Sequence, residues 1–276
     1  MSQKTTTEIF VIPEAWRQGW LKDDPWQRIM SLSGTVYREK DGRRTLRFTI
    51  AGQSYFAKLH QGPGWRLFLK NLLRLKGFNP GAEPEWRAIE WLEKLKIPTT
   101  PLVAWGRRGQ NPLTRESFVI TRELKNTESL EDFCLSWKTN APDPVLKRRL
   151  LSRVAKISGT LHRADMNHCD LYICHFLLEL ENGQVRNPAD PILHLIDLHR
   201  VRRHHHLPRR WRIKDLAALY FSSFEIGLTL RDKLRFISLY SRQPWRVALD
   251  REAALWRRVE KRAQNFYREY QRRGPR

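Results

Sequence analysis

The chain has 276 residues, of which 41% are hydrophobic and 11 are tryptophan, so it can bury the core of one large domain or two lobes. Its net charge of +22 favours a polyanionic partner such as nucleic acid, anionic lipid or an acidic glycan, but the arginines are dispersed and no nucleic-acid-binding motif is evident. No apolar run approaches the roughly 20 residues that span a bilayer, no export signal is evident, and the cysteines suit a reducing cytoplasm.

The first part of the chain predicts an N-terminal arm followed by a small antiparallel sheet. Residues 1–30 contain three tryptophans but no clear periodicity. Over residues 31–122, alternating apolar and polar residues flank turns at Asp41-Gly42 and Gly52, as in two consecutive hairpins, and a helix is expected to begin at Pro84. The pattern predicts one helix and five strands, centred on residues 35–37, 46–50, 54–59, 103–106 and 117–121.

The remainder, residues 123–276, predicts a mainly helical lobe. Leu150, Val154, Ile157 and Leu161 recur at helical spacing, and a basic amphipathic helix is expected from Leu249 to the C-terminus. A Gly- and Lys-rich linker is expected over residues 62–81. The expected fold class is therefore α+β with two lobes, in the order of elements typical of protein kinases.

Two aspartates predict phosphoryl-transfer chemistry. Asp170 lies on a short loop after the apolar helix, where a carboxylate can orient an acceptor hydroxyl and take its proton. Asp197 follows an apolar strand and suits Mg²⁺ on ATP phosphates. His175 stands where kinases usually place a metal-binding Asn, so it is expected to contact the metal directly or through water.

The same segment admits a zinc interpretation, because it also contains several potential zinc ligands. Their spacing fits no common zinc motif, so the kinase interpretation is preferred. The ligands in question are His168, Cys169, Cys174 and His175.

A lysine on an apolar strand is the expected ATP-binding residue. Lys58 needs an anion there, either ATP phosphates or a helix glutamate, with Glu85 the first candidate and Glu90 the second. Gly34 stands where protein kinases have three glycines, and its neighbouring amides suit either a phosphate cradle or an ordinary turn. Asp215 likewise has two interpretations, as a partner of the catalytic-loop backbone or as a surface carboxylate near a helix N-terminus.

Longer motifs extend this pattern over nearly the whole chain. They include Tyr55-Phe56-Ala57-Lys58, Tyr172-Ile173-Cys174-His175-Phe176-Leu177-Leu178, Ile196-Asp197-Leu198-His199-Arg200 and Lys214-Asp215-Leu216-Ala217. With these motifs the chain resembles the lipopolysaccharide core heptose(I) kinases of Gram-negative bacteria, the WaaP/RfaP group. The resemblance implies a protein-kinase-like fold and transfer of the ATP γ-phosphate to the 4-hydroxyl of the first inner-core heptose. It also implies action in the cytoplasm, on the cytoplasmic face of the inner membrane.

Matching positions assign roles to individual residues. Asp170 corresponds to the catalytic aspartate, Lys58 to the ATP lysine, Glu85 to its partner and Asp197 to the Mg²⁺ ligand. The charge makes an anionic membrane surface an expected partner, and the acceptor-binding residues are sought just after the metal aspartate, at Arg200, Arg202 and Arg203.

The chain departs from the family at two positions. Cys169 replaces the usual Arg, which argues against a switch based on a phosphorylated loop, and Leu171 replaces a Cys. Two alternatives stay open: a kinase of the same fold with another acceptor (Kdo, another small molecule or a protein tyrosine), and a basic nucleic-acid-binding protein on a kinase-like scaffold. With the kinase residues present, nucleic acid is not the expected partner.

Overall fold

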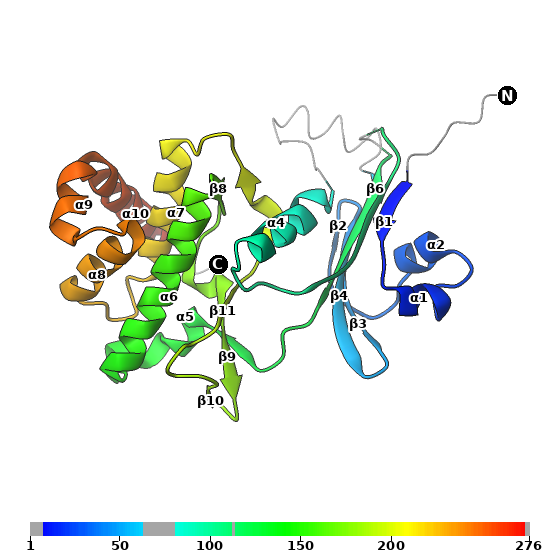
Figure 1. Ribbon diagram of the computed structural model, residues 1–276, viewed down its shortest axis with the longest axis horizontal. Helices are drawn as coiled ribbons and strands as arrows, with labels where there is room; N and C mark the ends of the chain where they lie inside the picture. The colour runs from blue at the N-terminus through cyan, green and yellow to red at the C-terminus, as the bar shows by residue number, and fades with distance from the viewer. Residues whose placement is uncertain (1–7, 63–80, 112–113, 274–276) are drawn as a thin grey trace. The chain divides into compact units, whose positions relative to one another are not determined.

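The computed structural model describes residues 8–62, 81–111 and 114–273 (Figure 1). The chain divides into two compact units, the first formed by Met1–Glu90 and Thr100–Leu124 and the second by Trp91–Thr99 and Lys125–Arg276. The linker expected over residues 62–81 lies, apart from its end residues, outside the described residues.

The first unit is built on an antiparallel sheet of six strands in the order β1-β5-β6-β4-β3-β2. The hairpin between β3 and β4 turns at Ala51 and Gly52, both with positive φ, as a two-residue hairpin loop requires. The strands are β1 (Glu8–Val11), β2 (Thr35–Lys40), β3 (Arg43–Ile50), β4 (Gln53–His60), β5 (Leu102–Arg108) and β6 (Glu116–Arg122). The helices are α1 (Glu14–Gln18), α2 (Pro25–Met30) and α4 (Glu83–Lys94), whose last residues belong to the second unit.

The sheet therefore has one strand more than the five predicted, because part of the expected N-terminal arm joins it. β1 pairs with β5 along its full length. Trp16 and Trp26 from the following short helices are buried in the core of the first unit, and Trp26 donates a hydrogen bond from Nε1 to Glu116 at 2.9 Å. β1 is only four residues long and half of it is exposed, so its sequence carries no strong alternation.

The second unit is mainly helical. α6 buries the predicted apolar face, including Leu150 and Leu161, and packs against α8, while α7 packs against α10. The long helices are α6 (Pro144–Arg163), α7 (Arg209–Ser222), α8 (Leu230–Ser241), α9 (Trp245–Arg251) and α10 (Ala253–Arg273). Shorter helical segments are α5 (Leu130–Phe133), η1 (Leu135–Lys138), η2 (Ile173–His175) and η3 (Leu198–Arg200).

The expected single C-terminal helix is two helices that meet at Glu252. The carboxylate of Glu252 pairs with Arg212 of α7 at 2.8 Å, and its backbone carbonyl accepts from Leu255 and Trp256 at the start of α10. The turn allows Ala248 and Leu255, on the two helices, both to be buried. The amphipathic pattern of α10 thus reflects packing, with Val259 and Ala263 in the core.

Short strands complete the second unit and frame the segment that carries Asp170. β7 (Thr127–Ser129), β9 (Phe176–Glu181), β10 (Gln184–Val185) and β11 (Leu193–Leu195) form one sheet, and β8 (Met166–Asn167) pairs with β12 (Arg202–Arg203). Along the described ranges, no helix is both long and apolar enough to cross a bilayer.

Candidate active site

Lys58 forms an ion pair inside the first unit. It lies in β4 between Ala57 and Leu59, both buried, and its Nζ is 2.6 Å from Oε1 of Glu85 in the first turn of α4. The structure thus places Glu85, rather than Glu90, beside the lysine. The Lys58 side chain is 32% exposed to solvent, so its ammonium group can still bind a further anion.

Gly34 has a packing role at the start of β2. A Cβ atom at this position would lie 2.2 Å from the carbonyl oxygen of Arg47 in β3, far inside van der Waals contact. Glycine is therefore required for the close approach of the two strands. This requirement is independent of the phosphate contact that the sequence suggests.

Asp215 anchors the loop that carries Asp170. Its buried carboxylate accepts backbone hydrogen bonds from His168 at 2.6 Å and from Cys169 at 2.9 Å. Of the two interpretations that the sequence leaves open, the first is confirmed, although Asp215 lies in the second turn of α7 rather than at its start. The carboxylate replaces the ladder partners that these amides would have in a longer strand.

A buried hydrogen-bond chain continues from Asp215 into the helices. His162, at the end of α6, has Nε2 3.3 Å from Asp215 and Nδ1 2.8 Å from the hydroxyl of Tyr240, which accepts from Nε of Arg212 at 2.7 Å. Burial raises the pKa of Tyr240 to about 12, so its hydroxyl keeps its proton and can donate to His162. The sequence analysis did not predict the roles of His162, Tyr240 and Arg212 in this chain of hydrogen bonds. The only available signal was that the polar His162 follows the last residue of an apolar helix face.

Two cations contact the carboxylate of Asp170. Nη1 of Arg200 lies 2.7 Å and 3.0 Å from its two oxygens, and Nζ of Lys214 lies 3.8 Å from Oδ1. Arg200, which the sequence suggested for acceptor binding, is therefore a partner of the predicted catalytic aspartate. Arg202 and Arg203 lie on the exposed strand β12.

The two residues expected to hold a metal lie close together. Nε2 of His175 is 3.5 Å from Oδ2 of Asp197, and Nδ1 of His175 is 2.7 Å from the backbone oxygen of Asp170. Asp197 adopts a left-handed backbone conformation with φ of 61°, which is uncommon outside glycine and concentrates at functional sites. Its other oxygen is 2.6 Å from Nδ1 of His199.

The fit of this pair to a metal follows from the histidine tautomer. A carbonyl oxygen only accepts, so Nδ1 of His175 is the donor in that hydrogen bond, and in the neutral tautomer with this donor the lone pair of Nε2 faces the oxygen of Asp197. Two such acceptors facing each other favour a cation between them. Within the described ranges, no three His, Cys, Asp or Glu side chains converge as a metal site. The pair therefore fits a cation that also takes oxygen ligands from substrate and water, as Mg²⁺ does.

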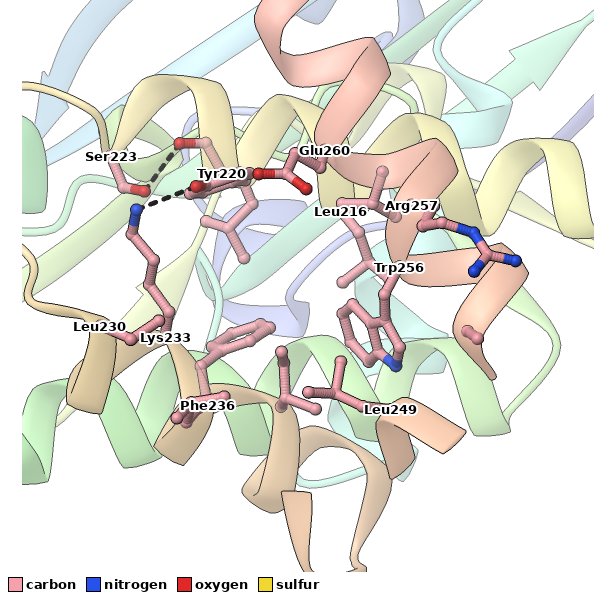
Figure 2. A pocket seen from close by; sticks show the side chains of 15 residues that line it. Leu216, Tyr220, Ser223, Leu230, Lys233, Phe236, Leu249, Trp256, Arg257 and Glu260 are labelled. Atoms are coloured by element: carbon pink, nitrogen blue, oxygen red, sulfur yellow. Dashed lines mark hydrogen bonds between the residues drawn. The ribbon is translucent and has the colours of Figure 1, made fainter. Parts of the chain in front are cut away.

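A separate apolar pocket opens among α7, α8, α9 and α10 (Figure 2). Its volume is about 450 Å³, and apolar side chains such as Leu216, Phe236 and Trp256 line it. Lys233 and Arg257 also line it, and Nζ of Lys233 donates to the hydroxyl of Tyr220. The pocket has the size and the apolar lining of a small-molecule site.

A strand lysine paired with a helix glutamate, and a loop aspartate followed by a second aspartate, are typical of kinase-type phosphotransferases. Known proteins identify the family. A profile described as "Lipopolysaccharide kinase (Kdo/WaaP) family" matches residues 27–240. The chain therefore belongs to the lipopolysaccharide kinase (Kdo/WaaP) family, and it is a kinase.

Individual relatives cover nearly the whole chain. It is 46% identical over 264 residues, 96% of its length and 98% of the relative's, to the lipopolysaccharide core heptose(I) kinase WaaP of Pseudomonas aeruginosa. It is 43% identical to the protein of the same name from Escherichia coli strain K12, over 92% of this chain and 96% of the relative. A solved structure described as "WaaP in complex with acyl carrier protein" superposes with a TM-score of 0.80 at 42% identity, covering 94% of this chain and 99% of that one.

Proposed function

We propose that this protein transfers the γ-phosphate of ATP to the 4-hydroxyl of the first heptose of the lipopolysaccharide inner core. The observation that carries the proposal is the 46% identity, over 96% of the chain, to a heptose(I) kinase. The Lys58–Glu85 pair and the Asp170 loop support it, because a working kinase needs both and a degenerate scaffold needs neither.

Each residue has a task that its surroundings suit. Lys58, held by Glu85, binds phosphate oxygens of ATP with the remaining hydrogens of its ammonium group. Asp170 orients the acceptor hydroxyl and takes its proton. Because Arg200 already pairs with the Asp170 carboxylate, the hydroxyl must bind this carboxylate alongside the guanidinium group. A contact between ATP phosphate and the amides beside Gly34 remains a prediction of the sequence.

Asp197 and His175 are proposed to hold Mg²⁺. Asp197 would supply the oxygen ligand that Mg²⁺ prefers and His175 a softer imidazole nitrogen, while phosphate oxygens and water would supply the remaining ligands. The ion would neutralise charge on the phosphates during transfer. The left-handed backbone conformation of Asp197 supports this role, because such conformations outside glycine concentrate at functional sites.

The proposal is tested with purified protein, Mg-ATP and lipopolysaccharide from a strain that lacks the heptose phosphate, with mass spectrometry of the product. The wild-type protein is expected to add one phosphate to the first heptose. Asp170→Asn should lower the rate by about 10²- to 10⁴-fold, the usual contribution of a general base. Asp250→Asn, on the exposed face of α9, is the matched control and should retain the rate.

The outcomes separate the candidate functions. Phosphate on another group, such as Kdo, would retain the kinase and change the acceptor. Absence of transfer together with tight, salt-sensitive binding of RNA would favour a nucleic-acid-binding scaffold and contradict the proposal.

An acyl carrier protein is a second proposed partner. The solved relative is described in complex with one, and this chain has an apolar pocket of about 450 Å³ lined partly by Lys233 and Arg257. An acyl chain that enters the pocket would gain about 0.8 kcal/mol for each buried CH₂ group. We therefore propose that the pocket among α7, α8, α9 and α10 receives the acyl chain of the carrier.

Two neighbouring alanines of α10 allow a matched test of this pocket. Ala253 lines it, whereas Ala254 is exposed on the same helix. Ala253→Phe should fill the pocket and weaken calorimetric binding of acylated carrier, and Ala254→Phe should not. Equal binding of acylated and unacylated carrier by the wild-type protein would contradict the role of the pocket.

We also propose that the protein works in the cytoplasm and docks on the anionic face of the inner membrane. The exposed side of α10 presents many arginines, and each Lys or Arg near such a surface adds about 1 kcal/mol of attraction. Sedimentation with vesicles of anionic and of zwitterionic lipid, at low and high salt, tests this. Binding that is equal for both lipids, or insensitive to salt, would contradict it.

A further inference from the structure

Trp211, in the first turn of α7, gathers three cationic side chains around its ring. The distances from the ring centroid are 5.5 Å to the guanidinium of Arg202, 5.6 Å to that of Arg210 and 5.7 Å to Nζ of Lys214. All three lie within the range of a cation–π interaction. Trp211 is half-buried, and both arginines are exposed. We call these four residues the Trp211 cluster.

The Trp211 cluster is tied directly to the loop of Asp170. Arg202 belongs to β12, where it pairs with Asn167 of β8, and β8 leads into that loop. Lys214 completes the link, because its Nζ is 3.8 Å from Oδ1 of Asp170. The ammonium group of Lys214 therefore connects the two groups, 3.8 Å from the carboxylate and 5.7 Å from the centre of the tryptophan ring.

The charges of the cluster are not balanced. No residue in positions 63–80 or the other undescribed segments is Asp or Glu, so every acidic side chain of the protein is described. None of these forms an ion pair with Arg202 or Arg210, and the only acidic partner of Lys214 is Asp170, which Arg200 already neutralises. Three like charges around one ring repel one another, so an anion placed among them would be stabilised.

We propose that the Trp211 cluster binds an anionic group, a carboxylate or a phosphate, on the sugar next to the acceptor hydroxyl. The inference rests on the proposed function and adds Trp211, Arg210 and Lys214 to its acceptor site. The ring holds the cations in place, the cations bind the anion, and the acceptor hydroxyl is thereby oriented toward Asp170. Orientation of the acceptor is a major part of catalysis in phosphoryl transfer, where the enzyme acts mainly by positioning the reactants.

The exposure of the arginines favours the acceptor over ATP as the source of the anion. Arg202 and Arg210 point to solvent from a surface strand and a helix start, so they can meet a large glycolipid without rearrangement. The phosphates of ATP already have Lys58 as their proposed partner. Kinetics with each substrate varied in turn separates the two sources.

The test uses the full-length protein and the mass-spectrometric transfer assay. The double variant R202Q/R210Q and the single variant Trp211→Leu should raise the KM for the acceptor by about tenfold to a hundredfold, the usual effect of losing charge-assisted hydrogen bonds. The KM for ATP should stay as in the wild-type protein. The matched control is Arg246→Gln, which removes another arginine stacked on a tryptophan, 4.3 Å above Trp245 on α9.

Modified acceptors identify the anion. With carboxyl-reduced acceptor or with dephosphorylated acceptor, the difference between wild type and double variant should vanish for whichever group the cluster binds. An unchanged acceptor KM in both variants, or a rise in the KM for ATP alone, would overturn the inference while leaving the kinase activity established. A wild-type protein without transfer would remove both the proposed function and this inference.

Discussion

Replacing Asp215 by alanine is expected to release the loop that carries Asp170. The Asp215 side chain is fully buried and accepts backbone hydrogen bonds from His168 at 2.6 Å and Cys169 at 2.9 Å. The variant leaves two buried N–H groups without an acceptor, and each such group costs about 1 to 3 kcal/mol. The free energy of unfolding of the second unit should therefore fall by about 2 to 6 kcal/mol. That is a large share of the stability of an ordinary domain.

Urea denaturation followed by circular dichroism measures this loss, and hydrogen exchange reports on the two amides directly. Both amides should exchange much faster in Asp215→Ala, and phosphate transfer should fall with them because the loop no longer holds Asp170 in one position. Asp250→Ala, at an exposed position of α9, is the control. A loss of less than about 1 kcal/mol with unchanged exchange would refute the reasoning.

Three further predictions concern stability and reactivity. Trp26→Ala should cost about 3 to 5 kcal/mol in urea denaturation, since Trp26 is 1% exposed in the core of the first unit; a much smaller loss would contradict that burial. Burial alone would raise the pKa of Asp232, but hydrogen bonds from Lys147 and Thr229 outweigh it and hold this pKa below its usual value. Its contribution to stability should therefore be complete above about pH 4 and disappear as the pH falls through the lowered pKa, so wild type and Asp232→Asn should converge in acid. Burial raises the pKa of Cys134 to about 12, so Ellman's reagent at pH 8 should label Cys134 only after unfolding, as peptide mapping can check.

Local sequence patterns were enough to predict the helices and strands that bury one face. Strands β2 to β6 and the apolar face of α6 were predicted because alternation and helical spacing are properties of neighbouring residues. β1 was missed because a strand of four residues, two of them exposed, has no such signature, and its place in the sheet depends on β5, about 100 residues later. The break between α9 and α10 was missed for a similar reason, since Glu252 turns toward Arg212 on another helix.

The sequence by itself determined the chemistry of this protein. A lysine on an apolar strand, a glutamate at the start of a helix, and aspartates after a helix and a strand predict the reacting groups by type and order. Only the tertiary structure decided their partners. It places Glu85, and not Glu90, beside Lys58, and it directs the carboxylate of Asp215 to the backbone amides of the loop. It also pairs Arg200 with Asp170 and places cations around Trp211. The first three pairings join residues 27 to 47 positions apart, and Arg202 reaches Trp211 from a separate strand. Side-chain pairing of this kind is set by packing, which a local pattern does not record.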